Sequence, residues 1–192
     1  MKILLTGFEP FGKATLNPSG EIVKQISGEN IVTAILPVAY AQSAERLLAL
    51  ISEHNPDVVI SLGQAEGRTQ ITPERIAINL DDARLADNEG VMRIDQPILV
   101  GGPVAYESTL PIKSFVERIK AQDVPAAVSL SAGAFLCNHI FYVMQNNFAG
   151  THVQSGFVHV PLMDEQAEEF PGLPTMPLDQ MVKAVRIMLE AL

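Results

Sequence analysis

The single cysteine of this 192-residue chain, Cys137, is the side chain best suited to nucleophilic chemistry. Ile140, Phe141 and Met144 follow it at the i+3, i+4 and i+7 spacing of one helix face, so the sequence predicts a helix that begins near Cys137. A thiol in the first turn of a helix lies beside free backbone amides, which lower its pKa and can bind an oxyanion. The alternative is a cysteine that packs in the core as a small apolar side chain.

A cysteine nucleophile needs a base, and the chain has four histidines, His54, His139, His152 and His159. On a helix, two positions correspond to about 200° of rotation, so His139 should point away from the Cys137 thiol. His54 ends a predicted surface helix and His152 lies in a polar stretch, so a solvated side chain is expected for both. His159 shares a face with Phe157 in a short predicted strand and is the candidate base. A hydrogen-bonded core histidine is its alternative.

Glu74 is the candidate partner for such a histidine. In an alternating segment it lies on the same face as Ile76 and Ile78, which places a carboxylate on an apolar face. A buried carboxylate needs a partner, and an imidazolium ion would be one. A structural ion pair with Arg75 or Arg84 is the alternative.

The elements that must position these residues alternate between strands and helices. Short apolar runs predict strands, and the run at 58–62 is typical of a central parallel strand covered on both faces. Residues 81–101 have little periodicity and predict a long structured loop. The order predicts one α/β domain over residues 1–192, a three-layer α/β/α sandwich. Strands are predicted at 2–6, 31–36, 58–62, 71–80, 126–130 and 157–160, and helices from 17, 43, 108, 137 and 181 onward.

The composition excludes several classes of partner. Thirteen Lys and Arg stand against 22 Asp and Glu, a formal net charge of −9, and such a surface repels nucleic acids and anionic membranes. No apolar run reaches the roughly 18 residues of a membrane span. A lone cysteine and an N-terminus unlike a signal peptide favour the reducing cytoplasm.

A series of short motifs, each present once, extends along nearly the whole chain. They are Thr6–Gly12, Asn17–Ser19, Gly63–Ala65 with Gly67-Arg68, Ile71–Asn79, Ala83-Arg84 with Asp87–Gly90, Leu110–Lys113, Ser131–Gly133 with Cys137-Asn138, and Gly156-Phe157 with His159 and Pro161. Together they resemble the pyrrolidone-carboxylate peptidase (pyroglutamyl-peptidase I) family of cysteine peptidases. Three places depart from the family pattern, Lys13, Ala86 and Met163-Asp164, and none of them replaces a matched catalytic position.

The resemblance implies an open, mostly parallel twisted sheet and removal of an N-terminal pyroglutamyl residue from peptides through a thioester, with no metal or other cofactor. It implies Cys137 as nucleophile, His159 as base, Glu74 as third member of the triad and Arg84 as a residue near the oxyanion. It also implies a homo-oligomer, with a tetramer as the expected form. The implied substrate-binding residues are Phe8 and Phe11 as an aromatic clamp, Gln64 as a polar contact, and Leu85, Phe135 and Leu136 as pocket wall.

Two other classes of protein remain as alternatives at this point. One is a small-molecule-binding or phosphorylase-like α/β protein in which Cys137 is a core residue, because Gly63–Arg68 follows a strand like a glycine-containing anion loop. That segment lacks both the GxGxxG spacing and the lysine of a P-loop. The other is an interaction module, but the sequence has no exposed heptad, basic stripe or repeat.

Overall fold

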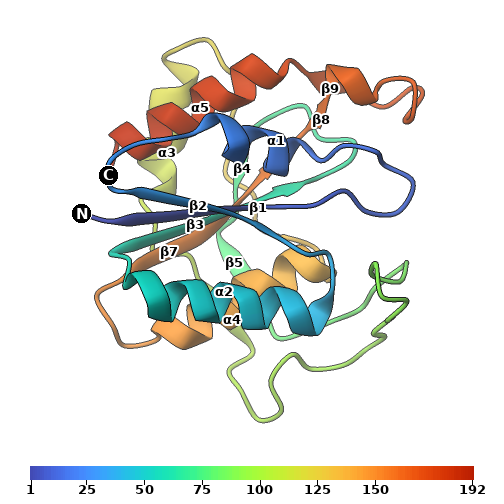
Figure 1. Cartoon of the computed structure of the whole chain (residues 1–192), viewed down its shortest axis with the longest axis vertical. Helices are drawn as coiled ribbons and strands as arrows, with labels where there is room; N and C mark the ends of the chain where they lie inside the picture. Colours follow the sequence, from blue (N-terminus) through green and yellow to red (C-terminus); the bar gives the residue numbers. More distant parts are fainter.

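Four parallel strands make up most of a twisted five-stranded sheet in the computed structural model, which describes all 192 residues (Figure 1). They are β1 (Ile3–Phe8), β2 (Ile31–Leu36), β3 (Val58–Gln64) and β7 (Gln154–Val160). The strand order is β2-β1-β3-β7-β4, and the short edge strand β4 (Thr72–Pro73) is antiparallel to β7. The carboxyl ends of β1, β3 and β7 therefore meet at one edge.

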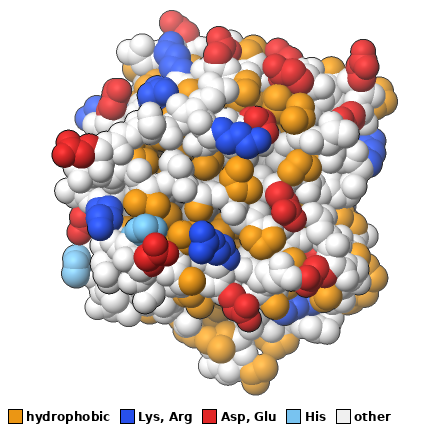
Figure 2. All heavy atoms as spheres, viewed as in Figure 1, with side chains coloured by type: hydrophobic (Ala, Val, Ile, Leu, Met, Phe, Trp, Pro, Cys, Tyr) orange, Lys and Arg blue, Asp and Glu red, His pale blue; other side chains and the backbone are white.

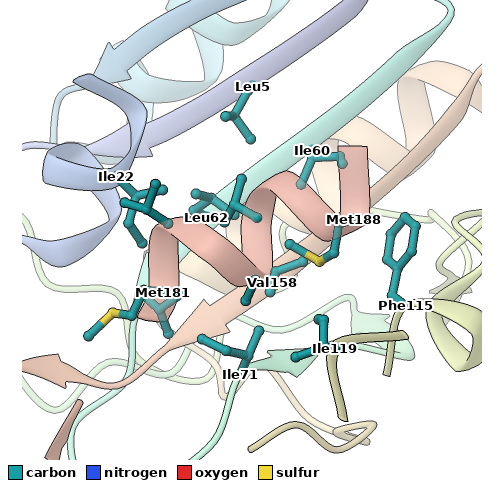
Figure 3. Close-up of a cluster of buried hydrophobic side chains, with 14 of the residues drawn as sticks. Leu5, Ile22, Ile60, Leu62, Ile71, Phe115, Ile119, Val158, Met181 and Met188 are labelled. Carbon is teal, nitrogen blue, oxygen red and sulfur yellow. The ribbon is translucent and has the colours of Figure 1, made fainter. Parts of the chain in front are cut away.

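Three helices cover one face of this sheet: α1 (Pro18–Gln25), α3 (Ile112–Lys120) and α5 (Leu178–Glu190). Figure 3 shows the apolar cluster between them and the strands, where Ile22 of α1, Phe115 of α3 and Met188 of α5 pack against Leu5 and Ile60. All five side chains are inaccessible to solvent. This cluster removes a large apolar area from water and is the larger of the two cores.

Two helices, α2 (Tyr40–His54) and α4 (Leu136–Phe148), cover the opposite face (Figure 1). Successive residues of a strand point to opposite faces, so Leu4 belongs to this second core while Leu5 belongs to the first. In β7 the same alternation puts Phe157 in the second core and Val158 in the first. His159 lies two residues after Phe157, so its side chain points to the same face of the sheet, towards α4. The predicted α/β/α sandwich with a mostly parallel sheet is confirmed.

Helix boundaries follow local chemistry. At α1 the predicted start is confirmed, because the Asn17 side chain accepts a hydrogen bond from the Ser19 amide and Pro18 occupies the first turn. Helix α2 begins at Tyr40, three residues before the predicted Ser43. It ends at His54, and Asn55, in a left-handed conformation (φ 46°), caps it just before Pro56.

The predicted strands at 71–80 and 126–130 are wrong in extent. Residues 71–75 and 125–129 do run side by side, and the amides of Ile71 and Arg75 donate to carbonyls of the 125–129 segment. Pro73 lies between Ile71 and Arg75 in the sequence and has no amide hydrogen. The hydrogen-bond ladder between the two segments is therefore interrupted, and only isolated bridges remain. The chain then leaves the sheet, and β5 (Ile76–Ile78) pairs instead with β6 (Ala105–Glu107).

The remaining elements follow β7. Strand β8 (Leu162–Met163) pairs with β9 (Thr175–Met176), and a short 3₁₀ helix η1 (Asp164–Gln166) lies between them. Residues 81–101 form a long loop without a helix or strand, as predicted. No helix of the structure has the length and apolar character needed to cross a membrane.

Candidate active site

A pocket of about 310 Å³ opens where β1, β3 and β7 end and α4 begins. Ligands of open parallel sheets bind at this edge. Most of the predicted site residues line it, although they are far apart in the sequence. They are Phe8, Phe11, Gln64, Phe135, Leu136, Cys137 and His159.

Cys137 is the second residue of α4, so the predicted helix start is confirmed. Its Sγ lies over the backbone of Gly63 in β3, where an added Cβ would come within 2.8 Å of the sulfur. His159 is the register partner of Gly63 on the adjacent strand β7. The thiol and the imidazole are therefore brought to the same place by a glycine that leaves room for the sulfur. This requirement for Gly63 was not predicted from the sequence.

The imidazole of His159 is held from behind by Glu74. Nδ1 of His159 lies 2.7 Å from Oε1 of Glu74, and both side chains are buried. The backbone amide of Glu74 also donates to the carbonyl of Phe157 on β7, which fixes the carboxylate beside the ring. An ionised carboxylate accepts the hydrogen on Nδ1, so Nε2 keeps its lone pair and can take a proton in the pocket.

Arg68 is a site residue that sequence reasoning missed, although it lies in a motif matched to the family. Its guanidinium lies 2.8 Å from Glu74 Oε1, hydrogen bonds to the Thr72 hydroxyl, and donates to the Ser131 carbonyl at 3.1 Å. It also lines the pocket. The predicted alternative, an ion pair of Glu74 with Arg75 or Arg84, does not form.

The charges of this cluster set its protonation states. Burial raises the pKa of Glu74, but the hydrogen bond and charge of His159, with the charge of Arg68, outweigh it and hold that pKa below its usual value. Burial lowers the pKa of His159 below its usual value, the pairing with Glu74 opposes this, and Arg68 lowers it further. At neutral pH the pair is therefore carboxylate and neutral imidazole.

The expected depressed pKa of Cys137 is wrong for the free protein. Cys137 is a half-buried residue whose thiol faces inward, and burial raises the pKa of that thiol to about 12. The negative charge of Glu74 adds to this effect, while Arg68 and the residue's own backbone amide oppose it. Desolvation of a thiolate outweighs the helix terminus here. The resting site holds a neutral thiol beside a neutral imidazole.

The start of α4 supplies hydrogen-bond donors. Phe135 precedes the helix and its side chain makes no capping hydrogen bond, so the first amides of α4 are not satisfied by a side-chain cap. These amides lie next to the thiol because Cys137 is itself in the first turn. They are placed to stabilise negative charge on an oxygen bonded to the carbon that the sulfur attacks.

Aromatic side chains form much of the pocket wall. Phe8 is buried against Phe157, with ring centroids 6.4 Å apart, whereas the half-buried Phe11 packs against Phe135 at 6.3 Å. Gln64, at the end of β3, places an amide among them. The pocket is thus mostly apolar with few polar groups.

Arg84 and Leu85 are not brought into this pocket. Both are exposed and line a neighbouring hollow, beside Gly133 and Phe135 on its rim. Their roles near the oxyanion and in the pocket wall stay predictions.

His139 lies outside the pocket, as the rotation argument predicted. Its Nδ1 lies 2.9 Å from a carboxylate oxygen of Asp81, and its ring packs edge-on against Tyr40. Asp81 is also paired with Arg93 at 2.8 Å. The chain thus has two buried histidine–carboxylate pairs, and only that of His159 faces the pocket. No group of three or more His, Cys, Asp or Glu is arranged to hold a metal ion.

The protonation states predict how Cys137 reacts with alkylating reagents. We expect its alkylation by iodoacetamide to accelerate steadily from pH 7 to pH 9, about tenfold per pH unit, because the thiolate fraction keeps rising below a pKa near 12. Stopped reactions analysed by mass spectrometry measure the rate. A rate that is already constant below pH 8 would show a preformed thiolate and contradict this assignment.

The chain is similar to known proteins over its whole length. The chain is 49% identical over its whole length to a pyrrolidone-carboxylate peptidase of Aliivibrio fischeri, of which it covers 92%. It is 47% identical to the pyrrolidone-carboxylate peptidase of Bacillus licheniformis, with 97% of this chain and 89% of the relative covered.

Solved structures are similar over the whole fold. Pyroglutamyl peptidase I from Bacillus amyloliquefaciens superposes with a TM-score of 0.94 at 45% identity, covering 97% of this chain and 92% of the other. A mutant pyrrolidone carboxyl peptidase from Pyrococcus furiosus superposes with a TM-score of 0.94 at 39% identity, covering 99% and 97%. The sequence model of the pyroglutamyl peptidase family matches residues 1–192, and the chain belongs to this family.

Proposed function

We propose that this protein is a cysteine exopeptidase that removes an N-terminal pyroglutamyl residue from peptides through a thioester acyl-enzyme. The observation that carries the proposal is the convergence of Cys137, at the start of α4, and His159, held by Glu74, on one mostly apolar pocket. Membership of the pyroglutamyl peptidase family supports the same activity.

The first half of the reaction forms the acyl-enzyme. Nε2 of His159 takes the thiol proton as the Cys137 sulfur attacks the carbonyl carbon of the pyroglutamyl residue. The oxygen of the tetrahedral intermediate accepts hydrogen bonds from the first amides of α4. Collapse breaks the C–N bond, His159 gives its proton to the leaving amine, and the pyroglutamyl group remains on sulfur as a thioester.

The second half returns the enzyme to its resting state. His159 takes a proton from water while the water oxygen attacks the thioester carbon, and the sulfur leaves with the proton that His159 releases. Glu74 stabilises the imidazolium formed in both halves and keeps Nε2 directed at the pocket. Without this carboxylate, the positive charge of the buried imidazolium would be costly.

The pocket suits the pyroglutamyl ring. Pyroglutamate is a flat, uncharged five-membered lactam, which needs apolar walls and a few polar contacts rather than an ion pair. Phe8, Phe11, Phe135 and Leu136 supply walls and Gln64 a polar contact. Leu85 and Arg84 belong to this proposal through the family resemblance, with Arg84 acting near the oxyanion.

The alternative of a small-molecule-binding or phosphorylase-like protein requires Cys137 to serve the core alone. Cys137 packs at the edge of the second core but lines the pocket beside His159, which favours catalysis. The segment Gly63–Gln64 ends a strand whose glycine accommodates the thiol, so it serves the nucleophile rather than a phosphate.

We further propose that residues 1–192 act as one peptidase domain, that the chain forms a homo-oligomer, with a tetramer as the expected form, and that it works in the cytoplasm, where the thiol stays reduced. The loop between β5 and β6 exposes apolar side chains, as at Val100 and Val104, which are 86% and 85% exposed. Figure 2 shows hydrophobic atoms at the lower end of the molecule, where Figure 1 places this loop. Nucleic acids and membranes are not expected partners of a chain with net charge −9.

Two histidine variants test the proposal against an internal control. We expect His159→Gln to lower turnover of a fluorogenic pyroglutamyl amide by about 10³-fold, because glutamine can donate to Glu74 but cannot carry the thiol proton. His139→Gln makes the same change at the other buried pair, with Asp81, and should leave turnover within about threefold of the unaltered protein. Full activity in folded His159→Gln, or no hydrolysis by the unaltered protein, would contradict the proposal.

The pH dependence of kcat/KM tests the role of Arg68. Activity requires neutral His159, so the acid limb follows the pKa of that imidazole in the free enzyme. Because Arg68 lowers this pKa, Arg68→Gln should raise it and move the acid limb to higher pH. Arg75→Gln is the control, since the Arg75 guanidinium forms no ion pair beside Glu74. An acid limb that stays in place or moves to lower pH in Arg68→Gln would disprove the assignment.

A further inference from the structure

The side-chain amide of Gln64 is buried but only half satisfied. Gln64 is 7% exposed and lines the pocket. Its Oε1 accepts a hydrogen bond from Nε2 of Gln166 at 3.0 Å, whereas its own Nε2 is buried without any partner. An unpaired buried donor is costly, so its presence in a pocket indicates a group that a ligand completes.

The direction of this amide is set by the backbone, through Gln166. Gln166 is wholly buried, and its Oε1 accepts from the Met163 amide at 3.1 Å while its Nε2 donates to the Leu16 carbonyl at 3.1 Å. A backbone amide can only donate and a carbonyl can only accept, so these two contacts fix which end of Gln166 is which. The second hydrogen on Gln166 Nε2 then requires an acceptor, and Gln64 must present Oε1 to it.

Gln64 is the pocket-lining residue that carries a buried side-chain atom without a partner. Three buried side-chain atoms lack a partner, on Tyr40, Gln64 and Glu74, and only Gln64 belongs to the pocket lining. Asn17 also lines the pocket, but its amide nitrogen donates to the Glu9 carbonyl and its oxygen accepts from Ser19. Gln64 Nε2 is therefore a buried side-chain donor, on a residue that lines the pocket, that no group of the protein satisfies.

We propose that Gln166 is a positioning residue that holds Gln64 with its NH₂ group directed at the substrate, where it donates to the ring carbonyl of the pyroglutamyl group. This inference rests on the proposed function and adds how the ring is told apart from similar rings. A prolyl ring has no carbonyl and would leave the buried donor unpaired, which disfavours its binding. The ring carbonyl is thus the feature that the Gln166–Gln64 pair selects.

The substitution Gln166→Glu tests the positioning role. A carboxylate can still accept from the Met163 amide but has no NH₂ group for Leu16 and Gln64, so Gln64 can turn its Nε2 away from the pocket. We expect KM for a pyroglutamyl amide, and Kd for the bare ring 2-pyrrolidone, to rise tenfold or more. Alkylation of Cys137 should stay within about twofold of the unaltered rate, because the thiol and His159 are untouched.

Gln145→Glu is the matched control. Gln145 is also a buried glutamine, with its amide bonded to the Ser155 carbonyl and hydroxyl, but it lies outside the pocket. It should lose stability without a tenfold change in Kd for 2-pyrrolidone. The positioning role is disproved if both variants weaken the binding of 2-pyrrolidone equally. It is also disproved if folded Gln166→Glu binds 2-pyrrolidone as tightly as the unaltered protein.

A measurement on the unaltered protein decides the case even if Gln166→Glu does not fold. In isotope-labelled protein, titration with 2-pyrrolidone should shift the side-chain NH₂ resonances of Gln64 strongly, and those of Gln166, already paired, only slightly. Unshifted Gln64 resonances at saturation would overturn the proposal. Both ring-binding measurements are independent of turnover, so failure of the proposed function, seen as no hydrolysis of pyroglutamyl amides, is a separate result.

Discussion

The hydrogen bond between His159 and Glu74 is the interaction on which the site depends. A carboxylate with no solvent exposure is costly unless charge-assisted partners compensate its lost hydration, and His159 and Arg68 are those partners. The same contact fixes the tautomer of the imidazole and so directs Nε2 at the pocket. One cluster thus compensates a buried charge and leaves Nε2 of the imidazole free to accept a proton.

The sheet edge makes this cluster possible. Pro73 interrupts the ladder between residues 71–75 and 125–129. The next residue, Glu74, bonds through its backbone to Phe157 and through its side chain to His159. On the other side, Gly63 leaves space for the thiol carried by α4. The irregular edge therefore positions the imidazole, and the missing side chain of Gly63 leaves room for the thiol.

Much of the fold could be predicted from local patterns. The apolar run at 58–62 and the helical spacing after Cys137 correspond to β3 and α4, and the rotation of a helix correctly separated His139 from the thiol. The strand boundaries near Pro73 were predicted wrongly. Pro73 has no amide hydrogen, and the effect of this on the sheet depends on the segment that lies beside it, residues 125–129.

The parts of the site that could not be predicted depend on contacts between distant segments. Arg68, Gly63 and Gln166 carry no local signal of their roles, and Gln64 is 102 positions from the side chain that orients it. The pKa of Cys137 was predicted with the wrong direction because a helix start can be read from sequence but the depth of the sulfur cannot. The family resemblance implies the catalytic roles, whereas the contacts that hold these side chains in place are visible only in the structure.

Covalent trapping of the acyl-enzyme tests the central claim most directly. An activated pyroglutamyl ester has a good leaving group, so deacylation becomes the slow step and the thioester accumulates. Acid quenching during turnover, followed by mass spectrometry of the digested protein, should find one pyroglutamyl group on the peptide that contains Cys137. Turnover with an unmodified Cys137 peptide, or with the acyl group on another side chain, would contradict the account.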